Sequence, residues 1–150
     1  MATEPDDGPI LFAYDGSDQA QAAIRHAGRQ LNTDRDAIVL TLWQPYGSLP
    51  FAGGEGLPPG LEDEMEREAE KVAEQGARLA RSIGFHATAR AERADSVWRS
   101  ILDWARDRGA SIVVMGSHGR TGLKAALTGS VATTVSRHAD RPVMIVNAAA

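Results

Sequence analysis

The sequence predicts an α/β protein in which parallel strands form one sheet with helices on both of its faces. Short apolar runs without polar alternation, such as Ile10–Tyr14 and Ser111–Met115, are typical of strands that are covered on both sides. Segments with apolar residues three and four positions apart stand between such runs and indicate helices. Because strands and helices alternate along the chain, right-handed crossovers should keep the strands parallel.

Length and composition fit a single domain over residues 1–150, long enough to bury a full core. The formal net charge of −4 and the scattered basic residues argue against a nucleic-acid partner. No apolar run approaches the ~20 residues that cross a bilayer, so we expect no membrane contact. Residues 1–8 lack the basic start and apolar core of a signal peptide. We expect a disordered tail there and a cytoplasmic protein, which the absence of cysteine also fits.

The first half of the chain predicts two strands, two helices and a long loop. The strand Ile10–Tyr14 runs into Asp-Gly-Ser-Asp at 15–18, residue types that are suited to capping a following helix. A second strand is predicted over Ala37–Trp43. Residues 44–60 are rich in glycine and proline and predict a flexible loop, either a lid over a ligand or a disordered connection. Apolar spacing between Leu61 and Ile83 predicts a long amphipathic helix.

The second half predicts three further strands and two helices. Phe85–Ala91 alternates weakly, which favours a strand at an edge of the sheet. The pair Asp95-Ser96 would cap the next helix. The strand Ser111–Met115 follows, then a helix from about Ser130 to His138, and finally a strand over Val143–Val146.

Glycines are concentrated after the strand that ends at Met115. Gly116 is followed two residues later by Gly119, and nine residues separate Gly119 from Gly129-Ser130. Glycines let backbone N–H groups approach an anion without a Cβ atom in the way, and a helix beginning near Ser130 would point its positive end there. The spacing matches neither a Walker A loop nor the dinucleotide fingerprint. It predicts a phosphate cradle, with a purely structural tight loop as the alternative.

This motif resembles the nucleotide-binding motif of the universal stress protein family, in its ATP-binding branch. The resemblance covers nearly the whole chain, from Ile10–Ser17 to Arg141–Val146. It implies a Rossmann-like fold of the adenine-nucleotide α-hydrolase type, with a five-stranded parallel sheet of order 3-2-1-4-5. In such sheets ligands bind where the strand order reverses, which here is between the first and fourth strands. The turns at Asp15 and Gly116 would then be neighbours.

The resemblance also implies which residues bind the nucleotide. The glycines and Ser130 would surround the phosphates, and Asp15 would lie near the ribose or a phosphate-bound metal. Adenine would be held at Ala13, Tyr14 and Trp43, largely through backbone atoms and apolar contacts, and Met115 would close the floor of the pocket. Asp15 and Ser130 could instead only cap helices, and Trp43 could belong to the ordinary core. The expected nucleotide-binding residues are Ala13, Tyr14, Asp15, Trp43, Met115, Gly116, Ser117, His118, Gly119, Arg120, Gly129, Ser130 and Val131.

The sequence shows no evident catalytic machinery. Arg120 and Lys124 could neutralise phosphate charge or remain solvated, and His118 could contact a phosphate. The other histidines have no metal-ligand spacing, and no serine has an assured partner for a catalytic triad. We therefore expect no catalytic residues and at most slow ATP hydrolysis, so an enzyme is the less favoured interpretation.

The expected function is that of an ATP-dependent sensor or regulator in a stress response. ATP would carry Mg²⁺ or Mn²⁺ bound through its phosphates, and the nucleotide state would change contacts with an unidentified regulatory protein. The resemblance further implies a homodimer through Val143–Val146, since unpaired edge strands invite a partner. Two alternatives stay open: a nucleotide-free dimeric interaction module, and an adenylating or ATP-cleaving enzyme, although the Ser-Gly-Gly loop of ATP pyrophosphatases is absent.

Overall fold

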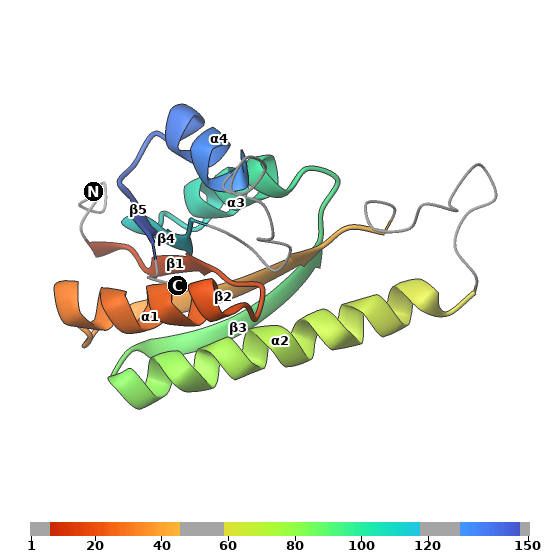
Figure 1. Cartoon of the computed structure of the whole chain (residues 1–150), viewed down its shortest axis with the longest axis horizontal. Helices are drawn as coiled ribbons and strands as arrows, with labels where there is room; N and C mark the ends of the chain where they lie inside the picture. Colours follow the sequence, from red (N-terminus) through yellow and green to blue (C-terminus); the bar gives the residue numbers. More distant parts are fainter. Residues whose placement is uncertain (1–6, 46–58, 118–129, 148–150) are drawn as a thin grey trace.

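Five parallel strands form one sheet in the computed structural model, which describes residues 7–45, 59–117 and 130–147 (Figure 1). The strand order is β3-β2-β1-β4-β5, and all four neighbouring pairs are parallel. The predicted fold class and strand order are therefore confirmed. The elements are β1 (Ile10–Ala13), α1 (Asp18–Gln30), β2 (Asp36–Trp43), α2 (Leu61–Ile83), β3 (His86–Arg93), α3 (Val97–Asp107), β4 (Ile112–Gly116), α4 (Ser130–His138) and β5 (Val143–Val146).

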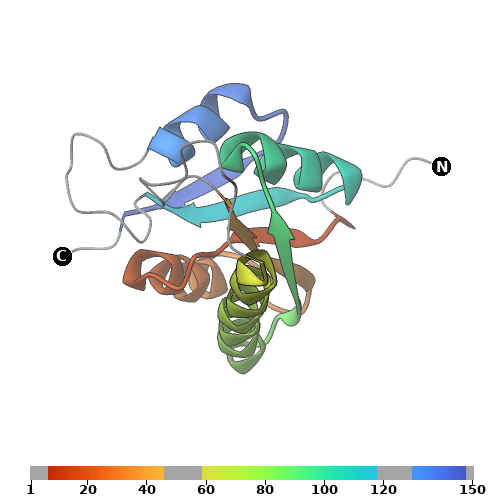
Figure 2. The same cartoon turned by 90° about the vertical axis from the view of Figure 1, so that its right-hand side faces the viewer.

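Helices cover both faces of the sheet (Figures 1 and 2): α1 and α2 lie on one face, and α3 and α4 on the other. Two apolar clusters result, one per face. Phe12 belongs to the cluster under α1 and α2, where its ring meets that of Phe85 edge-on at 5.5 Å. Leu11, the preceding residue, belongs to the cluster under α3 and α4. Successive residues of a strand point to opposite faces, so β1 contributes to both cores.

The buried face of α2 consists of small residues. Its larger apolar residues, such as Met65, Val72 and Leu79, are only half-buried. At Gly76 a Cβ atom would lie 2.7 Å from the ring of Tyr14 and 2.8 Å from Val39, so the helix packs directly against the sheet. The fully covered positions of α2 are Ala69, Ala73, Gly76, Ala77 and Ala80.

Parts of the predicted tail and loop lie outside the described residues, namely 1–6 and 46–58. The predicted lid over a ligand falls in the second of these segments. Gly8, at the end of the predicted tail, is held in place, because its carbonyl accepts a hydrogen bond of 3.2 Å from Arg35. Within the described residues, no helix combines the length and apolarity that a membrane span requires.

His86, at the start of β3, forms an exposed ion pair with Asp34. Its Nε2 lies 2.6 Å from Oδ1 of Asp34, and this hydrogen bond raises the pKa of the histidine. The protonated form is thereby favoured in the folded state. The resulting stabilisation is present below the unfolded pKa of about 6.5 and is lost as the pH rises through the raised folded value.

We therefore expect His86→Gln to lower the Tm at about pH 5.5. At about pH 9 the Tm should be unchanged, because the His86 imidazole is neutral in both the folded and the unfolded protein. Thermal denaturation at the two pH values measures this difference. His26→Gln is the control, because His26 forms no ion pair with any described residue. A Tm difference for His86→Gln that is the same at both pH values would contradict the expectation.

Candidate nucleotide-binding site

The carboxyl ends of β1 and β4 lie side by side. Phe12 of β1 is in register with Val114 of β4, which brings the turn after β1 close to Gly116. β1 is also paired with β2 on its other side, so the strand order reverses here. A Cβ atom on Gly116 would lie 3.0 Å from the main chain of Gln19, in the first turn of α1. The predicted neighbourhood of the two turns is therefore confirmed.

The turn between β1 and α1 is held by its own side chains. Oδ1 of Asp15 accepts a hydrogen bond of 3.0 Å from the N–H of Ser17, which closes an Asx turn. Gly16 between them has a φ of +84°, a left-handed conformation that favours glycine. Oγ of Ser17 accepts from the N–H of Ala20 at 3.1 Å and caps α1. The half-buried Asp15 carboxylate is thus fixed at the strand end by a rigid turn.

Ser17→Ala should destabilise the fold by about 1 kcal/mol, which corresponds to a fall in Tm of about 3 °C, because it leaves an N–H of α1 without its cap. Denaturant unfolding measures the change. Ser96→Ala is the matched control. Ser96 occupies the N-cap position of α3, as predicted, but its side chain forms no capping hydrogen bond. Equal losses for the two variants would show that the Ser17 cap contributes nothing.

Tyr14 follows β1 and is held by β2. Its N–H donates to the carbonyl of Leu40 at 2.9 Å, and its carbonyl accepts from Oγ1 of Thr41 at 2.9 Å. The residue is 3% exposed, and its hydroxyl donates to Gln75 on α2 at 3.3 Å. Burial, followed by the nearby Asp15 carboxylate, raises the pKa of this tyrosine. The Tyr14 ring is therefore part of the core beneath α2, and only the backbone of this residue lies at the strand end.

Thr41 was not anticipated as a functional residue. It is a buried hydroxyl within an apolar strand, and it fixes the backbone at the end of β1. The only sequence signal is one polar residue between Leu40 and Leu42. Glu66 on α2 was also not anticipated as a functional residue. Its carboxylate accepts a hydrogen bond from the indole N–H of Trp43. Trp43, half-buried at the end of β2, is thereby oriented by a carboxylate from the neighbouring helix.

On the β4 side of the point where the strand order reverses, Met115, Gly116 and Ser117 are all buried. The N–H of Ser117 donates to the carbonyl of Val146 at 3.0 Å, so the chain leaves β4 while still paired to β5. Met115 and the half-buried Val131 both pack in the cluster under α3 and α4. The side chain of Met115 is therefore directed into that core.

The structure brings together Ala13, Asp15 and Gly116, together with the backbone of Tyr14 and of Ser117, at the ends of β1 and β4. α4 begins at Ser130, as predicted. Four predicted site residues, and the phosphate candidate Lys124, lie outside the described residues. They are His118, Gly119, Arg120, Gly129 and Lys124.

Two further features bear on what the site can hold. Among the described residues, no cluster of three or more histidine, aspartate or glutamate side chains could bind a metal ion by itself. A shallow groove of about 300 Å³ lies between α3 and α4 and includes Trp98, Arg106 and His138. None of the predicted nucleotide-binding residues that the structure describes is among the residues that line this groove.

Comparison with known proteins identifies relatives over nearly the whole chain. Residues 8–147 match the model of the universal stress protein family. A universal stress protein of Mycolicibacterium smegmatis is 34% identical over 143 residues, which are 92% of this chain and 45% of that protein. Universal stress protein YxiE of Bacillus subtilis is 31% identical over 153 residues, 91% of this chain and 97% of that protein. This chain thus spans less than half of the mycobacterial relative.

Solved structures share the fold. Protein MJ0577 of Methanocaldococcus jannaschii has a TM-score of 0.80 at 25% identity, covering 97% of this chain and 99% of that one. A universal stress protein from Archaeoglobus fulgidus, solved with dAMP, has a TM-score of 0.63 at 23% identity over 92% and 96% of the two chains. A family member from Arabidopsis thaliana, solved with AMP, has a TM-score of 0.63 at 16% identity over 95% and 93%.

A further universal stress protein was solved in complex with cAMP. It has a TM-score of 0.67 at 20% identity, covering 93% of this chain and 97% of that one. At this identity the likeness establishes the shared fold. Together with the family model over 8–147 and the relatives above 30% identity, it leads to one conclusion: the chain belongs to the universal stress protein family.

Proposed function

We propose that this chain binds ATP at the adjacent ends of β1 and β4 and acts as a nucleotide-dependent sensor or regulator in a stress response. One observation carries the proposal. The strand order reverses between β1 and β4, and Asp15 and Gly116 meet there beside the first turn of α1. Solved proteins of the same fold were obtained with dAMP, AMP and cAMP, which supports an adenine nucleotide as the ligand.

The proposed division of labour follows the chemistry of the residues. Backbone N–H groups at the glycines and at Ser130 would bind the phosphates, because no Cβ atom obstructs a glycine. Asp15 would hold the ribose or the metal. Ala13 and Trp43, at the ends of β1 and β2, would contact adenine, with the indole oriented by Glu66. Arg120 would balance the phosphate charge.

A divalent ion fits this site only together with the nucleotide. Mg²⁺ keeps several waters and is bound by one or two carboxylates plus phosphate oxygens. Asp15 supplies one carboxylate, held at the strand end by its hydrogen bond to Ser17. We propose that Asp15 contacts a Mg²⁺ or Mn²⁺ ion bound through the phosphates, and that this ion neutralises phosphate charge.

Hydrolysis of ATP should be slow at most, because no general base is evident beside the proposed phosphate site among the residues that the structure describes. In that case the bound nucleotide persists, and its state would change the affinity for an unidentified regulatory protein in the cytoplasm.

A homodimer through β5 completes the proposal. Val143 and Ile145 carry outward-facing backbone groups on an edge strand, and such an edge binds a second strand readily.

Equilibrium binding of ATP tests the proposal directly. The protein is first freed of any nucleotide that remains bound during purification, and affinity is then measured with and without Mg²⁺. We expect saturable binding that strengthens with Mg²⁺, and we expect native mass spectrometry to detect ATP in untreated protein. Absence of measurable affinity would contradict the proposal. Rapid release of AMP and pyrophosphate would instead indicate an ATP-cleaving enzyme.

A further inference from the structure

The two edges of the sheet differ in how their backbone groups are used. β3 is the terminal strand on one side. The N–H of His86 donates to Arg35 at 2.9 Å and that of Ala94 to Trp43 at 2.8 Å, so even-numbered residues of β3 face β2. The backbone groups of the odd-numbered residues, from Ala87 to Arg93, therefore point outward. An added strand would have to pair with these groups.

Two consecutive outward carbonyls of β3 are already bonded by arginine side chains. Nε of Arg81, on α2, donates to the carbonyl of Ala87 at 2.9 Å. Nη1 of Arg90 donates to the carbonyl of Ala89 at 3.1 Å. Arg81 is itself fixed by Glu74, whose Oε1 lies 2.9 Å from Nη1. The guanidinium groups thus occupy neighbouring positions on the outer side of the strand, where an incoming chain would bind.

β5, at the opposite edge, has no comparable hydrogen bonds from described side chains to its outward carbonyls. The carbonyls of Pro142 and Val146 accept bonds from β4, so the backbone groups of Val143 and Ile145 face outward. Within the part of the chain that the structure describes, no side chain donates to either carbonyl. Both side chains are apolar and half-buried. Among the described residues, the β5 edge is therefore apolar and without such side-chain bonds, whereas two carbonyls at the β3 edge are bonded by arginine side chains.

We propose that Arg81 and Arg90 close the β3 edge against pairing with a second copy of this chain. An incoming strand would have to displace two charge-assisted hydrogen bonds and bring its backbone against two guanidinium groups. Edge-to-edge association is thereby confined to β5, and an assembly that grows by strand pairing ends after one contact. This inference concerns the edge opposite β5 and does not depend on nucleotide binding.

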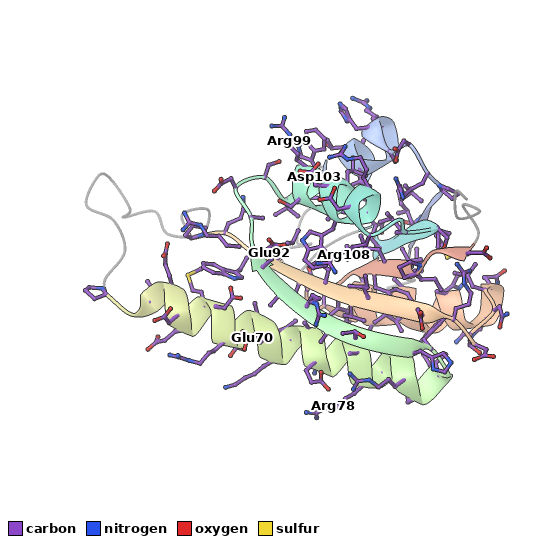
Figure 3. The ribbon with its side chains drawn as sticks, turned by 180° about the vertical axis from the view of Figure 1, so that it is seen from behind. Glu70, Arg78, Glu92, Arg99, Asp103 and Arg108 are labelled. Atoms are coloured by element: carbon purple, nitrogen blue, oxygen red, sulfur yellow. The ribbon has the colours of Figure 1, made fainter. Side chains whose placement is uncertain are left out.

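The experiment removes both arginine side chains and measures the assembly state of the protein. Arg81→Ala/Arg90→Ala should form species that grow with protein concentration, with about a two-fold or larger rise in weight-average mass over the parent by sedimentation and light scattering. The matched control is Arg78→Ala/Arg137→Ala, which removes the same charge from exposed positions. Figure 3 shows Arg78 projecting from α2 away from β3. This control should keep the mass distribution of the parent.

A third variant assigns the growth to β3. Ala91 has an outward N–H, so Ala91→Pro removes no bond of the sheet but blocks pairing at this edge. Adding it to the double variant should restore the parent's mass distribution. If the double variant does not fold, Arg90→Ala alone takes its place, because the hydrogen bond of Arg90 lies within β3. The parent's mass distribution in the folded double variant, or in Arg90→Ala if the double variant does not fold, would overturn the proposal, as would growth that Ala91→Pro leaves unchanged.

Discussion

Gly116→Val is expected to weaken ATP binding by about 100-fold, equivalent to about 2.7 kcal/mol. Even a Cβ atom at this position would lie 3.0 Å from the carbonyl carbon and oxygen of Gln19, and valine adds two methyl groups. Since the contact is with backbone, the end of β4 and the first turn of α1 must separate. That movement displaces Gly116 from Asp15 and disturbs the proposed phosphate site. Isothermal titration calorimetry with ATP and Mg²⁺ measures the loss.

Loss of stability must be separated from loss of binding, and Gly109→Ala provides that control. Gly109 has a φ of +62°, and apart from its chain neighbours no described residue has an atom within 4 Å of the place that a Cβ atom would take, so alanine there strains the backbone without a clash. The expected cost is about 1 kcal/mol. Gly109 precedes β4, at the opposite end of the strand from the proposed site. ATP affinity should therefore be unchanged in Gly109→Ala. If Gly116→Val bound ATP with the affinity of the parent, Gly116 would not be part of the binding site.

Local patterns predicted the fold well because each element has a local cause. The uninterrupted apolar runs became strands of a sheet covered on both faces, and Ser17 caps α1 as its residue type suggests. The buried face of α2 was predicted in part. Its spacing pointed to Ala69 and Gly76, which are buried, but also to larger residues such as Leu79 that are only half-buried, and it did not single out the buried alanines Ala73, Ala77 and Ala80. The distance between a helix and a sheet depends on the side chains of both, which here include the ring of Tyr14. The pattern of the helix alone therefore cannot predict it.

The candidate site was predictable only in outline. The adjacency of Asp15 and Gly116 follows from strand order, which the family resemblance supplied and periodicity alone could not. Thr41 and Glu66, which hold the strand ends, act on residues more than twenty positions away. Such contacts are set by tertiary structure. The residue types alone do not distinguish a buried hydroxyl or an orienting carboxylate from an ordinary surface group.

Arg141 is the clearest case of a residue whose role appears only in the fold, and Arg141→Met should destabilise the protein by about 3 kcal/mol. Nη1 of Arg141 donates to the carbonyls of Ala105 at 2.9 Å and of Ala110 at 2.7 Å, and Nε donates to Asp140 at 2.9 Å. The side chain is only 16% exposed. It therefore satisfies two carbonyls where α3 ends and the chain turns into β4. Methionine keeps the apolar stem but removes every donor.

The expected fall in Tm is about 9 °C, and denaturant unfolding should give the same ranking. Arg137→Met is the control, since Arg137 is exposed on α4 and should change stability by less than about 0.5 kcal/mol. Equal stability of the two variants would show that the Arg141 bonds contribute nothing net. Because Arg141 acts where β4 and β5 begin, folded Arg141→Met should bind ATP like the parent. Stability and binding would then depend on opposite ends of the same strands.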